Sequence, residues 1–181
     1  MEEKEKKVTV IRKARETDIS GVVKIYEKIH AWEQDGRMQI GWLPGVYPVE
    51  RTAVDALKRQ DLFVMEEDGL LVASAIINQK QVEAYRDGSW QFQVRGEEVM
   101  VLHTLTVDPD RGKRGFGRQF LEYYERYALE QGCSFLRMDT NEKNQAARLM
   151  YKKLGYQEAG VIPCEFNGIP GVNLVLLEKK L

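Results

Sequence analysis

A glycine-rich, basic segment near the middle of the chain combines residue types that bind phosphate. It runs from Asp108 to Arg118 and reads Asp-Pro-Asp-Arg-Gly-Lys-Arg-Gly-Phe-Gly-Arg. Its glycines let the backbone turn so that several N–H groups face one point, and the helix that follows adds unpaired N–H donors and partial positive charge. Such an arrangement suits a pyrophosphate. The basic side chains that add charge there are Arg111, Lys113, Arg114 and Arg118.

Taken alone, this segment could equally be a tight strand-to-helix turn with a solvated basic face. It is not a Walker loop, because the Gly-x-x-x-x-Gly-Lys-Ser/Thr pattern is absent. It is not a dinucleotide fingerprint either, because Gly-x-Gly-x-x-Gly does not occur in it. A second block, from Asn144 to Tyr156, favours the phosphate site. That block reads Asn-Gln-Ala-Ala-Arg-Leu-Met-Tyr-Lys-Lys-Leu-Gly-Tyr.

With both blocks, the sequence resembles the GNAT superfamily of N-acetyltransferases. That family has a phosphate loop of the form Arg/Gln-x-x-Gly-x-Gly/Ala after a strand ending in Val-x-Pro, here Val107-Asp108-Pro109. Its later helix follows Asn-x-x-Ala-x-x-Leu-Tyr-x-x-x-Gly-Phe, which the second block matches with small shifts. One departure is Gly112 at the first loop position, with Arg111 beside it. The resemblance covers residues 101–156 well and residues 8–100 only in the order of elements.

The resemblance implies direct transfer of an acetyl group from acetyl-CoA to an amine. By it, Asn144 helps hold the pantetheine arm and Tyr151 protonates the departing thiolate. The residues alone allow a helix N-cap at Asn144 and a partly buried core aromatic at Tyr151. Backbone N–H groups at a splay or bulge in the preceding strand are the predicted oxyanion donors. The predicted cofactor-binding residues are Leu105, Thr106, Val107, Arg111, Gly112, Lys113, Arg114, Gly115, Phe116, Gly117, Arg118 and Asn144.

The general base is left open between a histidine and two acids. His103 alternates with Val101, Leu105 and Val107, so a shared strand face would point it at the reaction centre. An imidazole with a pKa near 7 could take the amine proton, although a hydrogen-bonded core histidine is an equal alternative. Glu97 and Glu98, at the start of the strand, are rival bases. Arg137 and Asp139 are interpreted instead as a solvated or paired face.

An acceptor pocket is predicted from aromatic residues outside the matched blocks, because loops over a rigid scaffold commonly form substrate walls. For each of them, local packing is the alternative interpretation. The candidates are Trp42, Tyr47, Tyr85, Trp90, Glu165 and Phe166.

The elements that must position these groups follow from periodicity and turn signals. Apolar residues at helical spacing from Ile19 to Ile29, capped by Thr17 or Asp18, predict a first helix. Asp68-Gly69 predicts a hairpin turn, and residues 79–96 give no clear assignment. We predict an α/β, GNAT-like three-layer fold in which helices flank a central mixed, mostly antiparallel twisted sheet. The other predicted strands are 8–14, 99–107, 135–139, 156–161 and 172–177, and the other helices are 49–59, 115–131 and 144–154.

Composition limits the remaining possibilities. With 181 residues, a net charge of −1 and two cysteines without ligand-like spacing, the chain is predicted to be one cytoplasmic domain over residues 8–181 after a flexible tail, residues 1–7. We expect no nucleic-acid partner, no membrane anchor and no metal. The expected acceptor is a small-molecule or peptide amine. The alternatives are a catalytically weak acyl-CoA-binding module or an acyltransferase for longer chains. A homodimer could form if residues 174–177 joined a partner's sheet edge.

Overall fold

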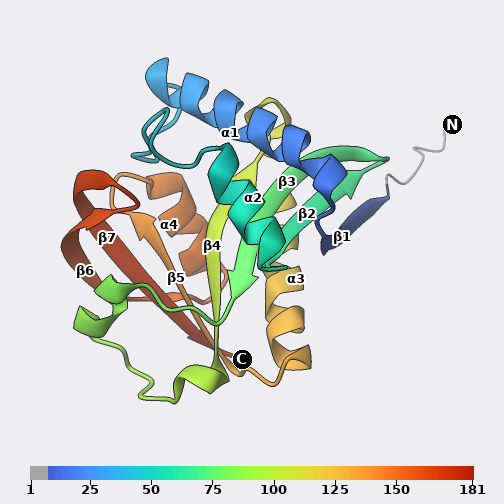
Figure 1. Cartoon of the computed structure of the whole chain (residues 1–181). Coiled ribbons are helices and arrows are strands. Elements are labelled where there is room, and N and C mark those ends of the chain that lie inside the picture. The colour runs from blue at the N-terminus through green and yellow to red at the C-terminus, as the bar shows by residue number, and fades with distance from the viewer. Residues whose placement is uncertain (1–7) are drawn as a thin grey trace, which may run out of the picture.

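Seven strands form one sheet in the order β1-β2-β3-β4-β5-β7-β6 (Figure 1). The computed structural model describes residues 8–181, so the predicted flexible tail lies outside the described residues. Every neighbouring pair is antiparallel except β4 and β5, which run parallel. The prediction of a mixed, mostly antiparallel sheet is therefore confirmed. The strands are β1 (Thr9–Lys13), β2 (Leu62–Glu67), β3 (Leu70–Asn78), β4 (Val99–Val107), β5 (Phe135–Asn141), β6 (Gln157–Phe166) and β7 (Ile169–Lys180).

Helices cover both faces of this sheet, which gives three layers (Figure 1). Helices α1 (Ile19–Gln34) and α2 (Glu50–Lys58) pack on one face, and α3 (Phe116–Glu130) and α4 (Gln145–Lys153) pack on the other. None of the helices within residues 8–181 is long and apolar enough to cross a membrane. The short 3₁₀ segments are η1 (Glu16–Asp18), η2 (Glu83–Asp87), η3 (Gly96–Glu98) and η4 (Pro109–Arg111).

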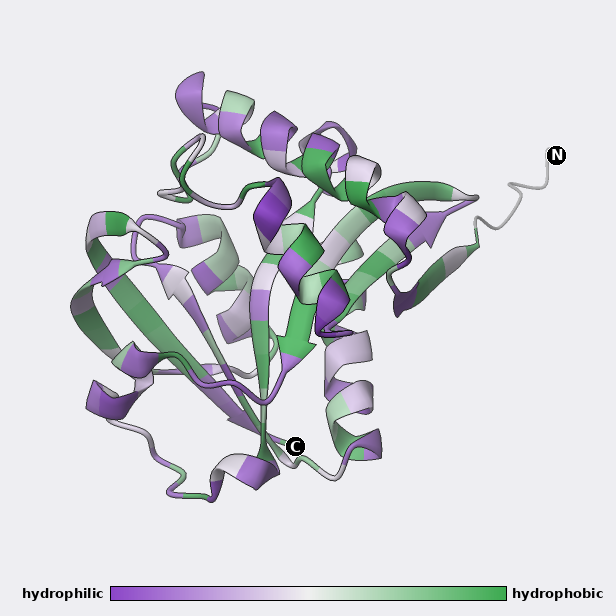
Figure 2. Ribbon diagram, in the orientation of Figure 1, coloured by the Kyte–Doolittle hydropathy of each residue, from purple (hydrophilic) through white to green (hydrophobic). Residues whose placement is uncertain are grey.

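The buried residues follow the predicted periodicities. In α3, Phe116, Phe120 and Tyr124 are spaced four apart, so they lie on one helix face, and all three are buried against the sheet. Apolar colour is concentrated along the central strands in Figure 2, whereas the outward sides of the helices are hydrophilic. This core supports β4 and β5 from the α3 side.

The last hairpin is longer than predicted. Strands β6 and β7 extend to a two-residue turn at Asn167-Gly168, where φ is +51° and +78°. Pro163 and Pro170 lie in these strands, and proline weakens a strand prediction because it cannot donate to the ladder. Strand β7 lies between β5 and β6, so the predicted pairing of Leu174–Leu177 with a partner's sheet edge is wrong.

Candidate functional site

The parallel strands β4 and β5 separate halfway along their length. They pair only from Val99 to Leu102, opposite Phe135 to Met138. Beyond this point β4 continues to Val107 and pairs on its other side with β3, whereas β5 continues beside β7. Among the described residues, nothing pairs with the side of β4 that faces β5 from His103 to Val107. A slot with unpaired backbone groups therefore opens between the strands, as expected for the predicted splay.

A bulge in β4 lies at the start of this slot. Ile76 of β3 pairs with His103 and Ser74 pairs with Thr106, so Thr104 and Leu105 together oppose one residue of β3. Thr104 has φ +50°, in the left-handed region. The extra residue reverses the alternation that follows it.

The predicted shared face of His103, Leu105 and Val107 is therefore wrong. Leu105 and Val107 pack against the core on the α3 side, whereas Val101 belongs to the cluster on the opposite face. Alternation along a strand assumes a regular pleat, and the bulge interrupts it.

The predicted phosphate loop begins where β4 ends. Lys28 of α1 holds its start, with Nζ 2.9 Å from Oδ2 of Asp108 and 2.8 Å from Oδ2 of Asp110. Lys113 and Gly115 then take φ values of +62° and +80°, and Gly115 caps α3. Within residues 8–181, the backbone amides of residues 113–115 donate no hydrogen bond. These amides and the first turn of α3 form the kind of unpaired donor cluster that binds an anion.

The basic side chains of the loop are mostly engaged with acids. Glu67 of β2 accepts a hydrogen bond from Nη2 of Arg114 at 2.6 Å and lies 3.7 Å from Nη1 of Arg111. Arg118 pairs with Glu122 at 2.9 Å. Lys113 makes no ion pair with any described residue. The backbone amides of residues 113–115 are thus donors of this loop that no described residue engages, whereas its arginines already have acidic partners.

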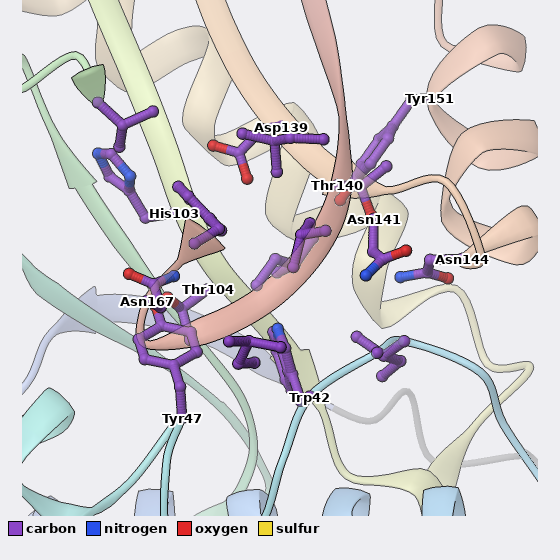
Figure 3. Close-up of a pocket in the computed structure, with 18 residues that line it drawn as sticks. Trp42, Tyr47, His103, Thr104, Asp139, Thr140, Asn141, Asn144, Tyr151 and Asn167 are labelled. Carbon is purple, nitrogen blue, oxygen red and sulfur yellow. Dashed lines mark hydrogen bonds between the residues drawn. The ribbon is translucent and has the colours of Figure 1, made fainter. Parts of the chain in front are cut away.

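A pocket of about 120 Å³ lies at the other end of the slot (Figure 3). Its walls come from the middle of β4, the end of β5, α4 with its N-cap, the loop before α2 and the β6–β7 hairpin. Carboxylate, imidazole, hydroxyl and amide groups thus meet beside aromatic rings. The residues labelled in Figure 3 are Trp42, Tyr47, His103, Thr104, Asp139, Thr140, Asn141, Asn144, Tyr151 and Asn167.

Helix α4 brings both of its predicted functional residues to this pocket. Tyr151 is only 6% exposed, and its ring meets Tyr156 edge-on. Burial, together with the charge of Asp139, raises the pKa of Tyr151, so the phenol stays protonated at neutral pH. Its hydroxyl has no hydrogen-bond partner in the described part of the chain. Asn144 caps the helix by accepting from the amide of Ala147 at 3.2 Å, and it also lines the pocket.

Asp139 of β5 is a pocket residue that the sequence interpretation placed elsewhere. Burial raises its pKa from 3.8 to about 6, although a 2.7 Å hydrogen bond from the Tyr85 hydroxyl opposes the shift. We expected Asp139 to lie on a solvated or paired face of its strand, but its carboxylate lines the pocket together with Tyr151. Its neighbour Arg137 is buried, with Nη1 2.6 Å from Oε1 of Gln81. One signal could have identified Asp139 as a pocket residue. It is a carboxylate two residues before the end of a strand that borders the slot.

His103 lines the pocket but is a weaker base than predicted. Burial lowers its pKa to about 4, not the expected value near 7. Its Nε2 lies 2.9 Å from Oδ1 of Asn78. The rival bases Glu97 and Glu98 precede β4 at the end remote from the pocket, and both pair with Arg95. They are therefore not placed to act at this site.

The structure places the predicted acceptor residues in three different environments. Trp42, Tyr47 and Phe166 line the pocket, and the Tyr47 hydroxyl is hydrogen-bonded to that of Thr104. Tyr85 and Trp90 are instead buried in the neighbouring core cluster, where the indole N–H donates to the Tyr85 carbonyl at 2.7 Å. Glu165 is exposed and outside the pocket walls. Predictions from composition could not distinguish a loop aromatic that faces a cavity from one that faces the core.

An acid on α1 holds the loop that carries Trp42 and Tyr47. The Glu33 carboxylate accepts from the amide of Ile40 at 3.0 Å and from that of Gly41 at 2.6 Å. At Gly41 a β-carbon would lie 2.3 Å from Nδ2 of Asn141, so the loop backbone passes directly over the end of β5. The aromatic wall is thereby fixed to the strand that carries Asp139.

Curated relatives match part of the chain. An uncharacterized N-acetyltransferase of Methanocaldococcus jannaschii is 30% identical over 56% of this chain and 44% of its own length. The S-(2-succino)cysteine N-acetyltransferase of Bacillus subtilis is 27% identical over 58% of this chain and 59% of its own. The ribosomal protein bS18-alanine N-acetyltransferase of Escherichia coli is 33% identical over 33% of this chain and 40% of its own length. The chain thus spans about half the length of the curated relatives it matches.

Solved structures share the fold over nearly the whole chain. A GNAT-family acetyltransferase of Streptococcus agalactiae superposes with a TM-score of 0.77 at 24% identity, covering 96% of this chain and 95% of that one. A Salmonella typhimurium protein is described as an acetyltransferase and was solved with acetyl-CoA. It superposes with a TM-score of 0.68 at 17% identity, covering 96% of this chain and 94% of that one. These likenesses concern the fold, and they confirm the predicted α/β architecture.

A family model described as "Acetyltransferase (GNAT) family" matches residues 25–156. This range contains β4 with its bulge, the predicted phosphate loop and α4. The predictions of an acyltransferase and of acetyl-CoA as its co-substrate agree with that match. Together, the sequence blocks, the splayed sheet and the family model establish that the chain belongs to the GNAT family of acetyltransferases.

Proposed function

We propose that this protein transfers an acetyl group from acetyl-CoA to a primary amine of a small molecule or peptide. The observation that carries the proposal is the slot beside β4, which joins the open amides of the loop to the pocket of Asp139 and Tyr151. Two relatives whose names state an acceptor act on a cysteine derivative and on a ribosomal protein, which supports both acceptor classes.

In this proposal the chain binds the two ends of acetyl-CoA with different groups. The amides of residues 113–115 and the first turn of α3 receive the pyrophosphate, with Lys113 as the nearby cation. The unpaired edge of β4 after His103 receives the pantetheine amides, as an added strand would. Backbone amides at the Thr104–Leu105 bulge are the donors for the oxyanion.

Acetyl-CoA supplies a thioester, whose carbonyl carbon is attacked by the amine nitrogen. The new C–N bond forms, the C–S bond breaks, and one proton must leave the nitrogen while another reaches the sulfur. Asp139, with a pKa of about 6, accepts the amine proton directly or through a water molecule. Tyr151 donates the proton to the thiolate. Asp139 thus replaces His103 as the base in the proposal, because the pKa of His103 is lowered to about 4.

The test measures coenzyme A release from acetyl-CoA with a panel of primary amines, free amino acids and short peptides. We expect release that depends on the amine, together with an increase in the melting temperature when acetyl-CoA is added. Stabilisation without release across the panel would identify a binding module instead. Faster release from a longer acyl-CoA would contradict the acetyl specificity.

A further inference from the structure

A second cavity, which we call the α2 groove, lies beside the pocket. It runs between α2 and the end of β3 and has a volume of about 370 Å³, within the range of about 300–1,000 Å³ usual for small ligands. Its walls include Arg51 and Arg59 of the α2 region and Lys80 after β3. The β4–β5 slot lies elsewhere, so the α2 groove is not the path of the cofactor arm.

The α2 groove and the pocket share four wall residues. Tyr47, Val82, His103 and Asn167 line both cavities. A ligand that lies in the α2 groove can therefore extend past His103 towards the reaction centre. This geometry suits an acceptor whose amine is in the pocket while another part of it remains in the groove.

Cationic groups dominate the walls of the α2 groove. Arg51 pairs with Asp55 at 3.3 Å, and Arg59 pairs with the buried Asp61 at 3.0 Å, so each acid is already engaged. The Lys80 ammonium makes no ion pair in the part of the chain that the structure describes. Both arginines also keep N–H groups that their single acid does not use, because a guanidinium has five. An added anion would therefore find donors without displacing an existing pair.

A chain of hydrogen bonds links these cations to the pocket wall. The Asp61 carboxylate accepts from Nδ2 of Asn78 at 2.9 Å, and Oδ1 of Asn78 accepts both from the Lys80 backbone amide and from Nε2 of His103, each at 2.9 Å. The amide orientation is fixed by these partners, so Nε2 of His103 carries the ring proton. Hydrogen bonds thus tie together the wall between groove and pocket. Burial is the main cause of the low pKa of His103, and the charges of Arg59 and Lys80 add to it.

We propose that the α2 groove binds a carboxylate of the acceptor, so that the acceptor is a free amino acid or a related amine bearing a carboxylate. The inference rests on the proposed acetyl transfer and narrows its substrate class. Lys80 and the outer N–H groups of Arg51 hold the carboxylate, while the amine lies beside Asp139. A peptide N-terminus lacks this nearby anion and gives Lys80 and the outer N–H groups of Arg51 no acceptor.

The experiment compares each free amino acid of a panel with its own α-carboxamide. For the accepted amino acids we expect kcat/KM to fall about tenfold or more in the amide, since a charge-assisted contact is lost. Lys80→Gln and Arg51→Gln should each raise KM for the acid about fivefold to tenfold, with little change for the amide. Raising the salt concentration should narrow the difference between acid and amide, because the groove is open to solvent.

Lys58→Gln is the matched control, because Lys58 lies on α2 but lines a different cavity. It should leave KM for the amino acid unchanged. Equal rates with acids and amides, or transfer to peptides but to no free amino acid, would overturn the carboxylate inference and leave acetyl transfer standing. No release with any amine, and no stabilisation by acetyl-CoA, would overturn the proposed function and this inference together.

Discussion

At the scale of single residues, burial shifts the two proton-accepting side chains of the pocket in opposite directions. It raises the pKa of Asp139 to about 6 and lowers that of His103 to about 4, because in each case the charged form is disfavoured. At neutral pH both are therefore proton acceptors, and Asp139 is the stronger one. A base works best when its pKa lies near the working pH, which favours Asp139.

The pH dependence of kcat/KM tests this assignment. As pH falls through about 6, Asp139 becomes protonated and activity should decline on the acid side. Asp139→Asn should remove that limb and lower the rate by about 10²–10⁴-fold. His103→Gln serves as the comparison and should keep the limb near pH 6. An acid limb that persists in Asp139→Asn and disappears in His103→Gln would reverse the assignment.

The same carboxyl should also affect stability. Its folded-state pKa of about 6 lies above its ordinary value of 3.8, so between these values the folded protein binds a proton that the unfolded chain has lost. The stabilisation is present below pH 3.8 and lost as pH rises through about 6. The melting temperature of Asp139→Asn should therefore increase relative to wild type from pH 4 to 6 and stay offset above that. A constant offset over the whole range would show that the folded-state pKa is not raised.

Tyr151→Phe removes the proposed proton donor and keeps the ring that packs against Tyr156. Because the hydroxyl has no hydrogen-bond partner among the described residues, the folded structure loses little. We expect kcat to fall about 10²-fold or more while affinity for acetyl-CoA is unchanged. Steady-state assays of coenzyme A release measure kcat, and calorimetry measures the affinity for acetyl-CoA. An unchanged kcat would contradict the role of Tyr151 as the proton donor.

At the scale of elements, the site depends on interruptions of regular structure. The divergence of β4 from β5 leaves an open strand edge, and the bulge at Thr104–Leu105 directs neighbouring side chains to new faces. The loop before α3 then needs left-handed backbone at Lys113 and Gly115 to keep its amides unpaired. At each interruption, backbone groups that regular structure would pair are left without an internal partner among the described residues, so a ligand can bind them.

Gly115→Ala tests the loop. Gly115 has φ +80° and open space around it, so the added methyl acts through the backbone at a cost of about 1–2 kcal/mol. We expect at least a tenfold loss of acetyl-CoA affinity by calorimetry, because the amides lose their common direction. Gly132→Ala is matched in φ, at +79°, and in open space, but it follows the far end of α3. It should cost similar stability and leave affinity intact; equal affinity losses in both variants would exclude a specific role for the loop.

At the scale of the whole molecule, the slot joins elements from most of the chain. Helix α1 holds the loop through Lys28 and the aromatic wall through Glu33, while α3 and α4 pack on the opposite face. A ligand that spans the loop and the pocket therefore contacts segments that separate only when the sheet itself unfolds. Its binding should stabilise the entire fold.

The melting temperature in the presence of acetyl-CoA measures this coupling. At a concentration about 100-fold above Kd, binding adds about 2.7 kcal/mol, which corresponds to a rise of about 5–10 °C for a chain of this size. Acetyl-pantetheine, which lacks the pyrophosphate, should raise it much less. An unchanged melting temperature at millimolar acetyl-CoA would contradict the proposed binding mode.

The sequence by itself determined the elements whose signals are local. The extent of the strand at residues 99–107, the turn at Asp68-Gly69 and the spacing of apolar residues in α3 depend on near neighbours, and all were predicted correctly. The glycine-rich loop and the block around Tyr151 are also contiguous, so the family resemblance could be recognised from them.

Only the tertiary structure decided which side chains meet. Asp139 is interpreted from the sequence as part of a solvated or paired face, yet it lines the pocket, where burial raises its pKa. Tyr85 and Trp90, predicted to line the pocket, are covered by the core instead. The bulge at Thr104 reversed the predicted face of Leu105, because it depends on the register of β3 against β4. Burial and register arise from contacts between residues far apart in the chain, which local spacing does not encode.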